Sequence, residues 1–214
     1  MERYTKGMLE GTSRMVEIID NMLDVSRIDS NLLEISPAEM QIDQVFEKIT
    51  KAFGAAFEER KLTFKMQGVS NLPVIQADKD LIYKVFYHVV GNAIKYTPDG
   101  GSITVSGRLT EDDPKDPEIE IAVKDTGIGI DAQYHELIFE KFYQTGEVLL
   151  HSSGKTKFKG GGPGLGLAIS RGIINAHHGR IWLESTGHNE QTYPGSTVYV
   201  RLSVNGHFHE NPTA

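Results

Sequence analysis

A polar stripe within an otherwise apolar stretch, residues 78–97, carries the side chains best suited to chemistry. They are His88, Asn92, Lys95 and Tyr96, whose i, i+4, i+7 and i+8 spacing places them on one face of a helix. An asparagine amide oxygen suits Mg²⁺, a lysine neutralises phosphate, and a tyrosine ring can cover a purine. The stripe therefore predicts a site for a metal-bound nucleotide, and its plainer interpretation is a solvated helix face.

Glycine supplies the second signal, because the chain has 22 glycines and the informative ones gather in three places. The first is the hexapeptide from Asp125 to Ile130, in which Gly127 and Gly129 directly follow an apolar strand pattern. These glycines allow the backbone to turn tightly against a ligand, while the carboxylate can accept a hydrogen bond from an exocyclic amine. Taken alone, this motif is better interpreted as a turn that Asp125 caps.

The second place runs from Gly160 to Leu167, where five glycines and two leucines lead into a helix pattern. Successive glycines let backbone N–H groups approach phosphate, and the N-terminus of a helix favours an anion. A flexible linker is the alternative, although a linker has no need of the regularly placed Leu165 and Leu167. The third place, Gly195-Ser196-Thr197, indicates by itself only a turn.

Several familiar classes of site do not fit this chain. Gly154-Lys155-Thr156 is similar to the end of a P-loop, but that motif needs a glycine where Leu149 stands. A dinucleotide fingerprint needs a strand directly before its glycines, and the irregular residues 144–162 stand there instead. The absence of cysteine excludes disulfides and thiol nucleophiles, and the net charge of -7 argues against a nucleic-acid partner.

Hydrophobic spacing defines the elements that must position these residues. It predicts helices over 42–57, 78–97 and 165–176, and strands over 62–66, 103–105, 119–123, 181–183 and 198–200. This order indicates an α+β two-layer domain. Ahead of it, apolar residues recur every seven positions, as at Met8, Met15 and Met22, which predicts one long helix with a wide apolar face. We expect that face to pack against helices outside this chain.

Together these segments resemble the catalytic ATP-binding domain of sensor histidine kinases, within the superfamily that includes gyrase, heat-shock chaperones and mismatch-repair proteins. The match covers about residues 34–204 and follows the family's order. Its motifs are an N box at 88–98, a first glycine box at 125–130, an F box at 138–143, a second glycine box at 162–169 and a last one at 195–197. The resemblance implies a Bergerat-type sandwich, in which helices cover one face of a mixed, mostly antiparallel sheet.

The resemblance also implies a role for each residue of the stripe. Asp125 would accept a hydrogen bond from the adenine amino group, and Asn92 would hold Mg²⁺ against the phosphates of ATP. Lys95 would approach the phosphates, and Tyr96 would sit beside the base. With Asn92 and Lys95, His88 completes the expected catalytic set.

A lid over ATP is implied for residues 144–161, hinged by glycines and anchored by Phe139 and Phe142. Its lysines, Lys155, Lys157 and Lys159, would contact phosphate or lie in solvent. The expected nucleotide-binding set comprises Asn92, Lys95, Tyr96, Asp125, Gly127, Gly129, Ile130, Phe139, Phe142, Gly162, Gly164, Leu165, Gly166, Leu167 and Thr197.

The first N-box position departs from the family pattern. It is His88, where histidine kinases usually carry asparagine and the ATP-hydrolysing relatives carry a glutamate base. Without that base the chain is not expected to be a free-standing ATP hydrolase. Two interpretations stay open: an active kinase core, or a degenerate nucleotide-binding module that signals as a pseudokinase.

The family's phosphoacceptor histidine lies on a first dimerisation helix, and none of the eight histidines here has its sequence context. We therefore expect residues 1–33 to be the second helix of a dimerisation hairpin, 34–205 the catalytic domain and 206–214 a flexible tail. The chain alone would bind Mg²⁺ and ATP without phosphorylating itself. The implied partners are a response-regulator receiver domain and a second copy of the parent, in the cytoplasm and without membrane contact by this fragment.

Overall fold

The predicted strands assemble into one five-stranded sheet in the order β2-β4-β5-β7-β6, in a computed structural model that describes residues 2–110, 115–144, 156–158 and 163–206. The strands are β2 (Thr63–Gln67), β4 (Ser102–Thr110), β5 (Glu118–Asp125), β6 (Arg180–Glu184) and β7 (Thr197–Ser203). β2 pairs with β4 in parallel, and the other neighbours are antiparallel. The sheet is therefore mixed and mostly antiparallel, as expected.

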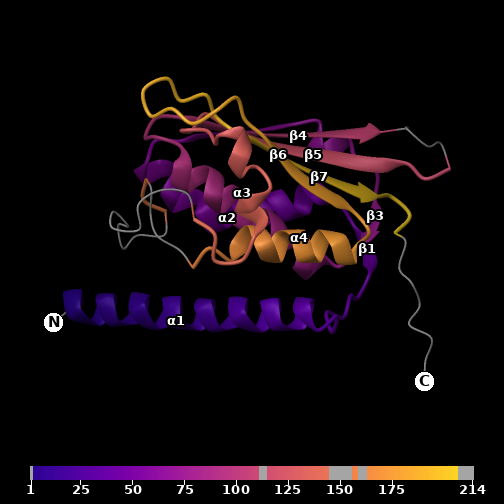
Figure 1. The fold of residues 1–214 in the computed structure, drawn as a ribbon, viewed down its shortest axis with the longest axis horizontal. Coiled ribbons are helices and arrows are strands. Elements are labelled where there is room, and N and C mark those ends of the chain that lie inside the picture. The colour runs from indigo at the N-terminus through magenta and orange to yellow at the C-terminus, as the bar shows by residue number, and fades with distance from the viewer. Residues whose placement is uncertain (1, 111–114, 145–155, 159–162, 207–214) are drawn as a thin grey trace.

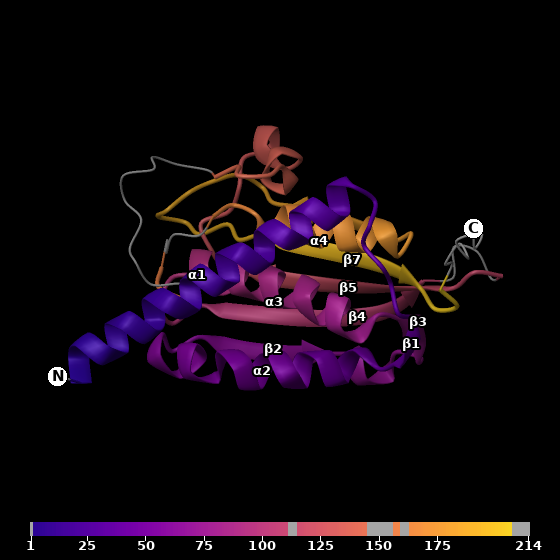
Figure 2. The ribbon, with the colours of Figure 1, turned by 90° about the horizontal axis from the view of Figure 1, so that it is seen from below.

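Three helices cover one face of this sheet (Figures 1 and 2). They are α2 (Ile42–Glu59), α3 (Lys79–Tyr96) and α4 (Gly166–Ala176). In β5, Ile119, Ile121 and Val123 are buried against the helices, because every second side chain of a strand points to the same face. Between α2 and α3, the Phe46 and Phe86 rings pack with centroids 4.8 Å apart. The two-layer α+β architecture is confirmed.

The opposite, open face of the sheet carries no helix in the described part of the chain, and side chains of neighbouring strands pack on one another there. Trp182 stacks on Tyr199, with ring centroids 5.0 Å apart and an interplanar angle of 8°. Glu120 is 5% exposed and pairs with Arg108 at 2.6 Å and Arg201 at 2.7 Å. Burial alone would raise the pKa of Glu120, but the two guanidinium groups outweigh it and hold that pKa below its usual value.

A second, two-stranded sheet and three short 3₁₀ helices were not predicted. β1 (Ala38–Met40) pairs antiparallel with β3 (Ile75–Ala77), and the 3₁₀ helices are η1 (Val69–Asn71), η2 (Ala132–Tyr134) and η3 (Leu137–Phe139). Each of these elements has three residues. Three residues are too few to show a hydrophobic period, so pattern reading cannot detect them.

The N-terminal helix α1 (Glu2–Asp29) lies along the helical side of the domain (Figures 1 and 2). Its inward side is partly polar, since Asp24 is 9% exposed and pairs with Lys84 of α3 at 2.6 Å. Near its end, Ile28 packs so closely on Gly172 of α4 that a Cβ there would lie 2.7 Å from the isoleucine. None of the helices in the described part of the chain is long and apolar enough to cross a membrane.

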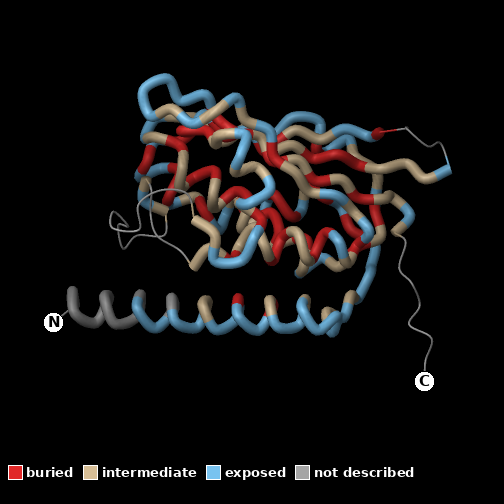
Figure 3. Tube along the Cα trace, viewed as in Figure 1, coloured by how far each residue is buried: buried red, intermediate tan, exposed pale blue. Residues whose placement is uncertain are grey.

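Helix α1 carries large apolar residues that are exposed, and most of its described length is pale blue in Figure 3. The exposed set is Met15, Val16, Ile19, Met22 and Leu23, each 51–69% accessible. This arrangement places apolar residues outward and Asp24 inward. The expected packing against helices outside this chain therefore stays a prediction.

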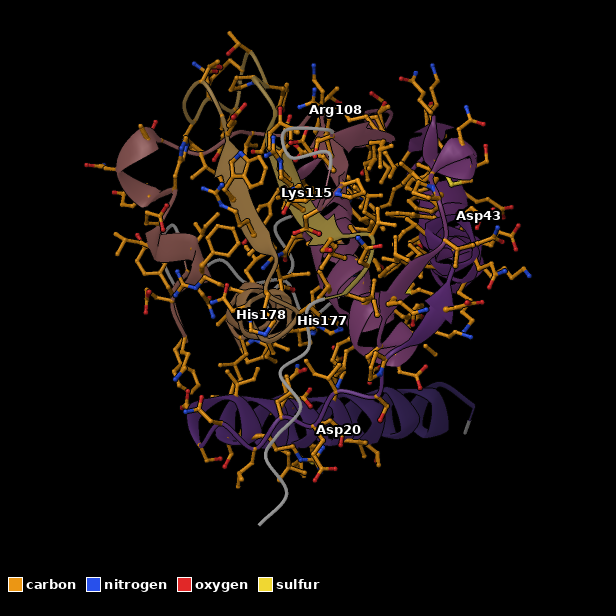
Figure 4. The ribbon with its side chains drawn as sticks, turned by 90° about the vertical axis from the view of Figure 1, so that its right-hand side faces the viewer. Asp20, Asp43, Arg108, Lys115, His177 and His178 are labelled. Carbon is orange, nitrogen blue, oxygen red and sulfur yellow. The ribbon has the colours of Figure 1, made fainter. Side chains whose placement is uncertain are left out.

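The far ends of α3 and α4 are joined by a buried histidine, which Figure 4 labels at the end of α4. His177 lies with Nδ1 2.8 Å from the Ile173 carbonyl and Nε2 3.1 Å from the backbone N of Asp78. A backbone N–H can only donate, so Nε2 accepts and Nδ1 carries the proton. The Asp78 carboxylate in turn caps α3 and accepts from the backbone N of Ser36 at 2.9 Å. One network thus ties the segment that follows α1 to both helices.

Candidate functional site

The polar stripe lies on α3, as predicted. Asp78 begins the helix, and its Oδ1 accepts hydrogen bonds from the backbone N atoms of Asp80 and Leu81, both at 3.1 Å. Four residues of the stripe are each half-buried: His88, Asn92, Lys95 and Tyr96. The Lys95 ammonium lies 4.7 Å from the Tyr96 ring centroid, so the last turn of α3 presents a cation and an aromatic ring side by side.

Asp125 is the buried acid of the site, at the end of β5 and 8% exposed. Its Oδ1 accepts from the backbone N of Gly127 at 2.7 Å and of Ser196 at 3.3 Å. Within the described part of the chain, Oδ2 takes part in no hydrogen bond, so it can accept from a ligand. Desolvation raises the pKa of Asp125 to about 6, although both N–H donors favour the ionised form.

Main-chain hydrogen bonds bring three of the predicted motifs into contact. Ile128 N donates to Tyr96 O at 3.1 Å, and Gly195 N donates to Gly127 O at 2.9 Å. A Cβ at Gly127 would clash with the Tyr96 carbonyl, and one at Gly195 with the Asp125 carbonyl. The ends of α3 and β5 and the turn before β7 therefore meet at distances that only glycine allows.

Two further predicted residues flank this meeting point. Thr197 opens β7, where it pairs with Lys124 of β5, one residue before Asp125. Gly129 has φ 71°, the left-handed region that favours glycine, and Ile130 N donates to Ser185 Oγ at 3.0 Å.

Sequence reasoning missed the segment after β6 that supports this turn. A Cβ at Gly129 would clash with Gly187 O and lie 2.7 Å from Pro194 Cγ. Ser185 Oγ also donates to Gly195 O at 2.7 Å, which joins the first and last glycine motifs. The signal available in the sequence was Gly187, whose φ of 136° suits glycine, but a single glycine between strands indicates no more than a turn.

The second glycine motif closes the site from the side of α4. Gly164 has φ 70°, and its carbonyl accepts from the backbone N of Phe142 at 2.9 Å. Leu165 is fully buried, whereas Gly166 and Leu167 are half-buried at the start of α4. A Cβ at Gly166 would lie 3.0 Å from His88 Nδ1, so the start of α4 lies against the first residue of the stripe. Gly162 lies outside the described residues.

The two phenylalanines expected to anchor the lid behave differently. Phe139 is 2% exposed, and the Arg171 guanidinium lies 5.7 Å from its ring centroid. Phe142 is 62% exposed, and its backbone contacts the second glycine motif through the hydrogen bond from its N–H to Gly164 O. Of the expected lid, residues 144 and 156–158 are described: Lys157 is exposed there, and Lys155 and Lys159 lie outside.

This arrangement fits a purine nucleotide with its phosphates. A buried carboxylate oxygen can accept from an exocyclic amine, and the start of α4 offers backbone N–H groups to an anion. Among the described residues, no three histidine, aspartate or glutamate side chains gather to hold a metal. The amide oxygen of Asn92 is a hard ligand that suits Mg²⁺, which usually takes one or two protein ligands and completes its shell with phosphate and water.

The raised pKa of Asp125 predicts a pH dependence of stability. Between pH 4 and 6 the folded carboxyl keeps a proton that the unfolded chain releases, so the free energy of unfolding should fall as pH rises through this window. Asp125→Asn keeps an oxygen for both N–H donors and should lack this decline, which amounts to about 2–3 kcal/mol. Urea titrations of the wild type and Asp125→Asn from pH 4 to 7.5 measure the free energy of unfolding. If this free energy changes with pH in parallel for the two proteins, the raised pKa of Asp125 is contradicted.

Comparison with known proteins places this geometry in a family. The histidine kinase-, DNA gyrase B-, and HSP90-like ATPase model matches residues 77–206. The chain is 33% identical over 174 residues to adaptive-response sensory kinase SasA of Gloeothece citriformis, covering 80% of the chain and 40% of that protein. It is 32% identical over 178 residues to sensor histidine kinase WalK of Bacillus subtilis, covering 81% of the chain and 27% of that protein. The chain thus spans less than half the length of each.

Solved structures share the fold at 20% sequence identity. ShkA in complex with AMPPNP has a TM-score of 0.75, covering 95% of this chain and 39% of that one. Acinetobacter baumannii histidine kinase AdeS has a TM-score of 0.73, and the match covers 96% of this chain and 86% of that one. Histidine kinase ThkA in complex with response regulator TrrA has a TM-score of 0.63, and the match covers 89% of this chain and 49% of that one. The chain belongs to the histidine kinase-, DNA gyrase B-, and HSP90-like ATPase family, and it is similar to the ATP-binding domains of sensor histidine kinases.

Proposed function

We propose that this domain binds Mg²⁺ and ATP and donates the γ-phosphoryl group to a histidine on a helix outside these 214 residues, for relay to a response regulator. The observation that carries the proposal is the meeting of Asp125 with the end of the polar stripe, through the hydrogen bond from Ile128 N to Tyr96 O. In this proposal, that contact brings the acid that would recognise the base close to the helix that would bind the phosphates. The relative ThkA, solved in complex with a response regulator, supports the second step.

Each residue of the site has a definite task in this proposal. Asp125 Oδ2 accepts from the adenine amino group, and Tyr96 lies beside the base. Asn92 holds the metal, and Lys95 neutralises charge on the phosphates. Bound Mg²⁺ would supply charge neutralisation during transfer, so the protein contributes mainly position and electrostatics.

The surface of α1 supports a paired arrangement of the parent protein. Its exposed methionine, valine, isoleucine and leucine side chains form an apolar stripe on the side away from the catalytic domain. A stripe of this size on a helix is typical of a surface that another helix covers. We propose that it belongs to a helical hairpin through which two copies associate.

A pseudokinase is the second candidate function, and the observation in its favour is the packing of His88. The imidazole lies against Gly166 at the start of α4, so it fills space where the two helices of the site converge. In that case the domain would hold nucleotide and signal through its conformation without transferring phosphate.

Nucleotide affinity tests the proposed site directly. We expect Asn92→Ala and Asp125→Asn each to weaken binding of Mg²⁺ and AMPPNP by about 10- to 100-fold, the equivalent of one charge-assisted hydrogen bond or metal ligand. Isothermal titration calorimetry on the 214-residue chain measures this. Asn175→Ala, an exposed asparagine near the end of α4, is the matched control and should bind as the wild type does. Equal affinities for all four proteins would overturn the site.

Phosphotransfer distinguishes the two candidates. The chain alone should acquire no acid-labile, base-stable label from ATP, whereas the chain joined to its acceptor helix should acquire it if the kinase is active. If the wild type stays unlabelled in that context and His88→Asn becomes labelled, the pseudokinase is the correct interpretation. Label on the isolated 214-residue chain would contradict the proposal that the acceptor lies elsewhere.

A further inference from the structure

Arg60, at the end of α2, is a buried cation that no part of the proposed reaction uses. Its side chain is 7% exposed, and a buried guanidinium is costly unless its donors are satisfied. Nε donates to Asp99 Oδ1 at 2.8 Å, and Nη2 donates to Thr97 O at 2.6 Å. Nη1 donates to Ile94 O and, at 3.0 Å, to Thr156 O. Three of these four acceptors are backbone carbonyls.

Two of the carbonyls lie at the end of α3, which carries the predicted ligand-binding residues: Ile94 is in its last turn, and Thr97 is the residue that caps it. Ile94 O and Thr97 O bracket Lys95 and Tyr96 in the chain. Carbonyls at the end of a helix have no partner within the helix, and a cation there also complements the helix dipole. Arg60 therefore fixes the turn from which Lys95 and Tyr96 project.

Two further contacts of Arg60 reach a different part of the chain. Thr156 accepts from Nη1, and the Phe158 ring centroid lies 5.9 Å from the guanidinium carbon, within the range of a cation–π contact. These contacts play no part in capping the C-terminus of α3. They hold residues 156–158, part of the expected lid, against the same turn.

We propose that Arg60 is a positioning residue for the nucleotide site, which holds residues 156–158 against the end of α3 and thereby sets how tightly ATP is bound. The inference rests on the proposed function for its effect on ATP, but not for the contact itself. Arginine is required because its planar fork serves acceptors in several directions, whereas a lysine ammonium would serve fewer of them.

The first arm of the test follows residues 156–158 without nucleotide. Trp182 is the sole tryptophan, so Trp182→Phe combined with Phe158→Trp places a single reporter in the segment. Its fluorescence anisotropy should fall when Arg60→Met is added and fall less with Arg60→Lys. Arg180→Met, at an exposed arginine of β6, is the matched control and should leave the anisotropy unchanged.

The second arm measures affinity for Mg²⁺ and AMPPNP by calorimetry. We expect a loss of about tenfold for Arg60→Met, in the range of one lost charge-assisted contact, and a smaller loss for Arg60→Lys. Phe158→Ala should weaken binding without lowering the melting temperature, which a purely structural role for Arg60 would not produce. If Arg60→Met does not fold, Arg60→Lys and Phe158→Ala decide the matter.

Two results would overturn the proposal. One is an anisotropy at position 158 that is the same in all Arg60 variants. The other is a nucleotide affinity that is unchanged by substitutions at both Arg60 and Phe158, in a chain that binds nucleotide. A wild-type chain that binds no nucleotide would instead contradict the proposed function. In that case the anisotropy arm still reports whether Arg60 holds residues 156–158.

Discussion

The proposed nucleotide site depends on a close main-chain crossing, in which the turn after β5 passes against both the end of α3 and the turn before β7. The hydrogen bonds Ile128 N to Tyr96 O and Gly195 N to Gly127 O close this crossing. Backbones can approach this closely only where side chains are absent, so the glycines at 127 and 195 are structural requirements. Burial of Asp125 follows from the crossing, and the raised pKa of that acid follows from its burial.

Helix α4 contacts α3 at both of its own ends. At the site itself, His88 of α3 lies against Gly166 of α4. At the far end, His177 accepts from the backbone N of Asp78, whose carboxylate also holds Ser36. The segment that leads from α1 into the domain is thus attached to the same helices that carry the site, so a displacement of α1 has a direct structural route to them.

Local signals in the sequence predicted the parts of this site that are local in the chain. The 3.6-residue period and Asp78 defined α3, alternation defined β5, and the glycine motifs marked where the backbone must turn. The contacts between these parts were available only through the family resemblance, because hydrophobic period and turn chemistry report on neighbours in sequence. The third glycine motif shows this: alone it indicates a turn, yet Ser196 N donates to Asp125.

Two kinds of feature could not be predicted from the sequence: contacts between residues far apart in the chain, and elements too short to show a hydrophobic period. In the sequence, Arg60 is indistinguishable from the other charged residues at the end of α2, because its hydrogen-bond partners lie 34 to 96 residues away. The parallel pairing of β2 with β4, the short β1 and β3, and the support from Ser185 are likewise set by tertiary contacts. Exposure of Phe142 has the same origin, since an aromatic residue in a motif does not reveal whether its ring or its backbone makes the contact.

An amide-resolved NMR titration of the 214-residue chain with Mg²⁺ and AMPPNP tests the central claim most directly. The account predicts that the largest shifts fall on the crossing and the stripe, at Asn92, Tyr96, Gly127, Ile128 and Ser196. The open face of the sheet around Arg108 and Trp182 should stay unperturbed. Shifts that are absent from the crossing, or that gather on the open face, would show that nucleotide is bound elsewhere or not at all.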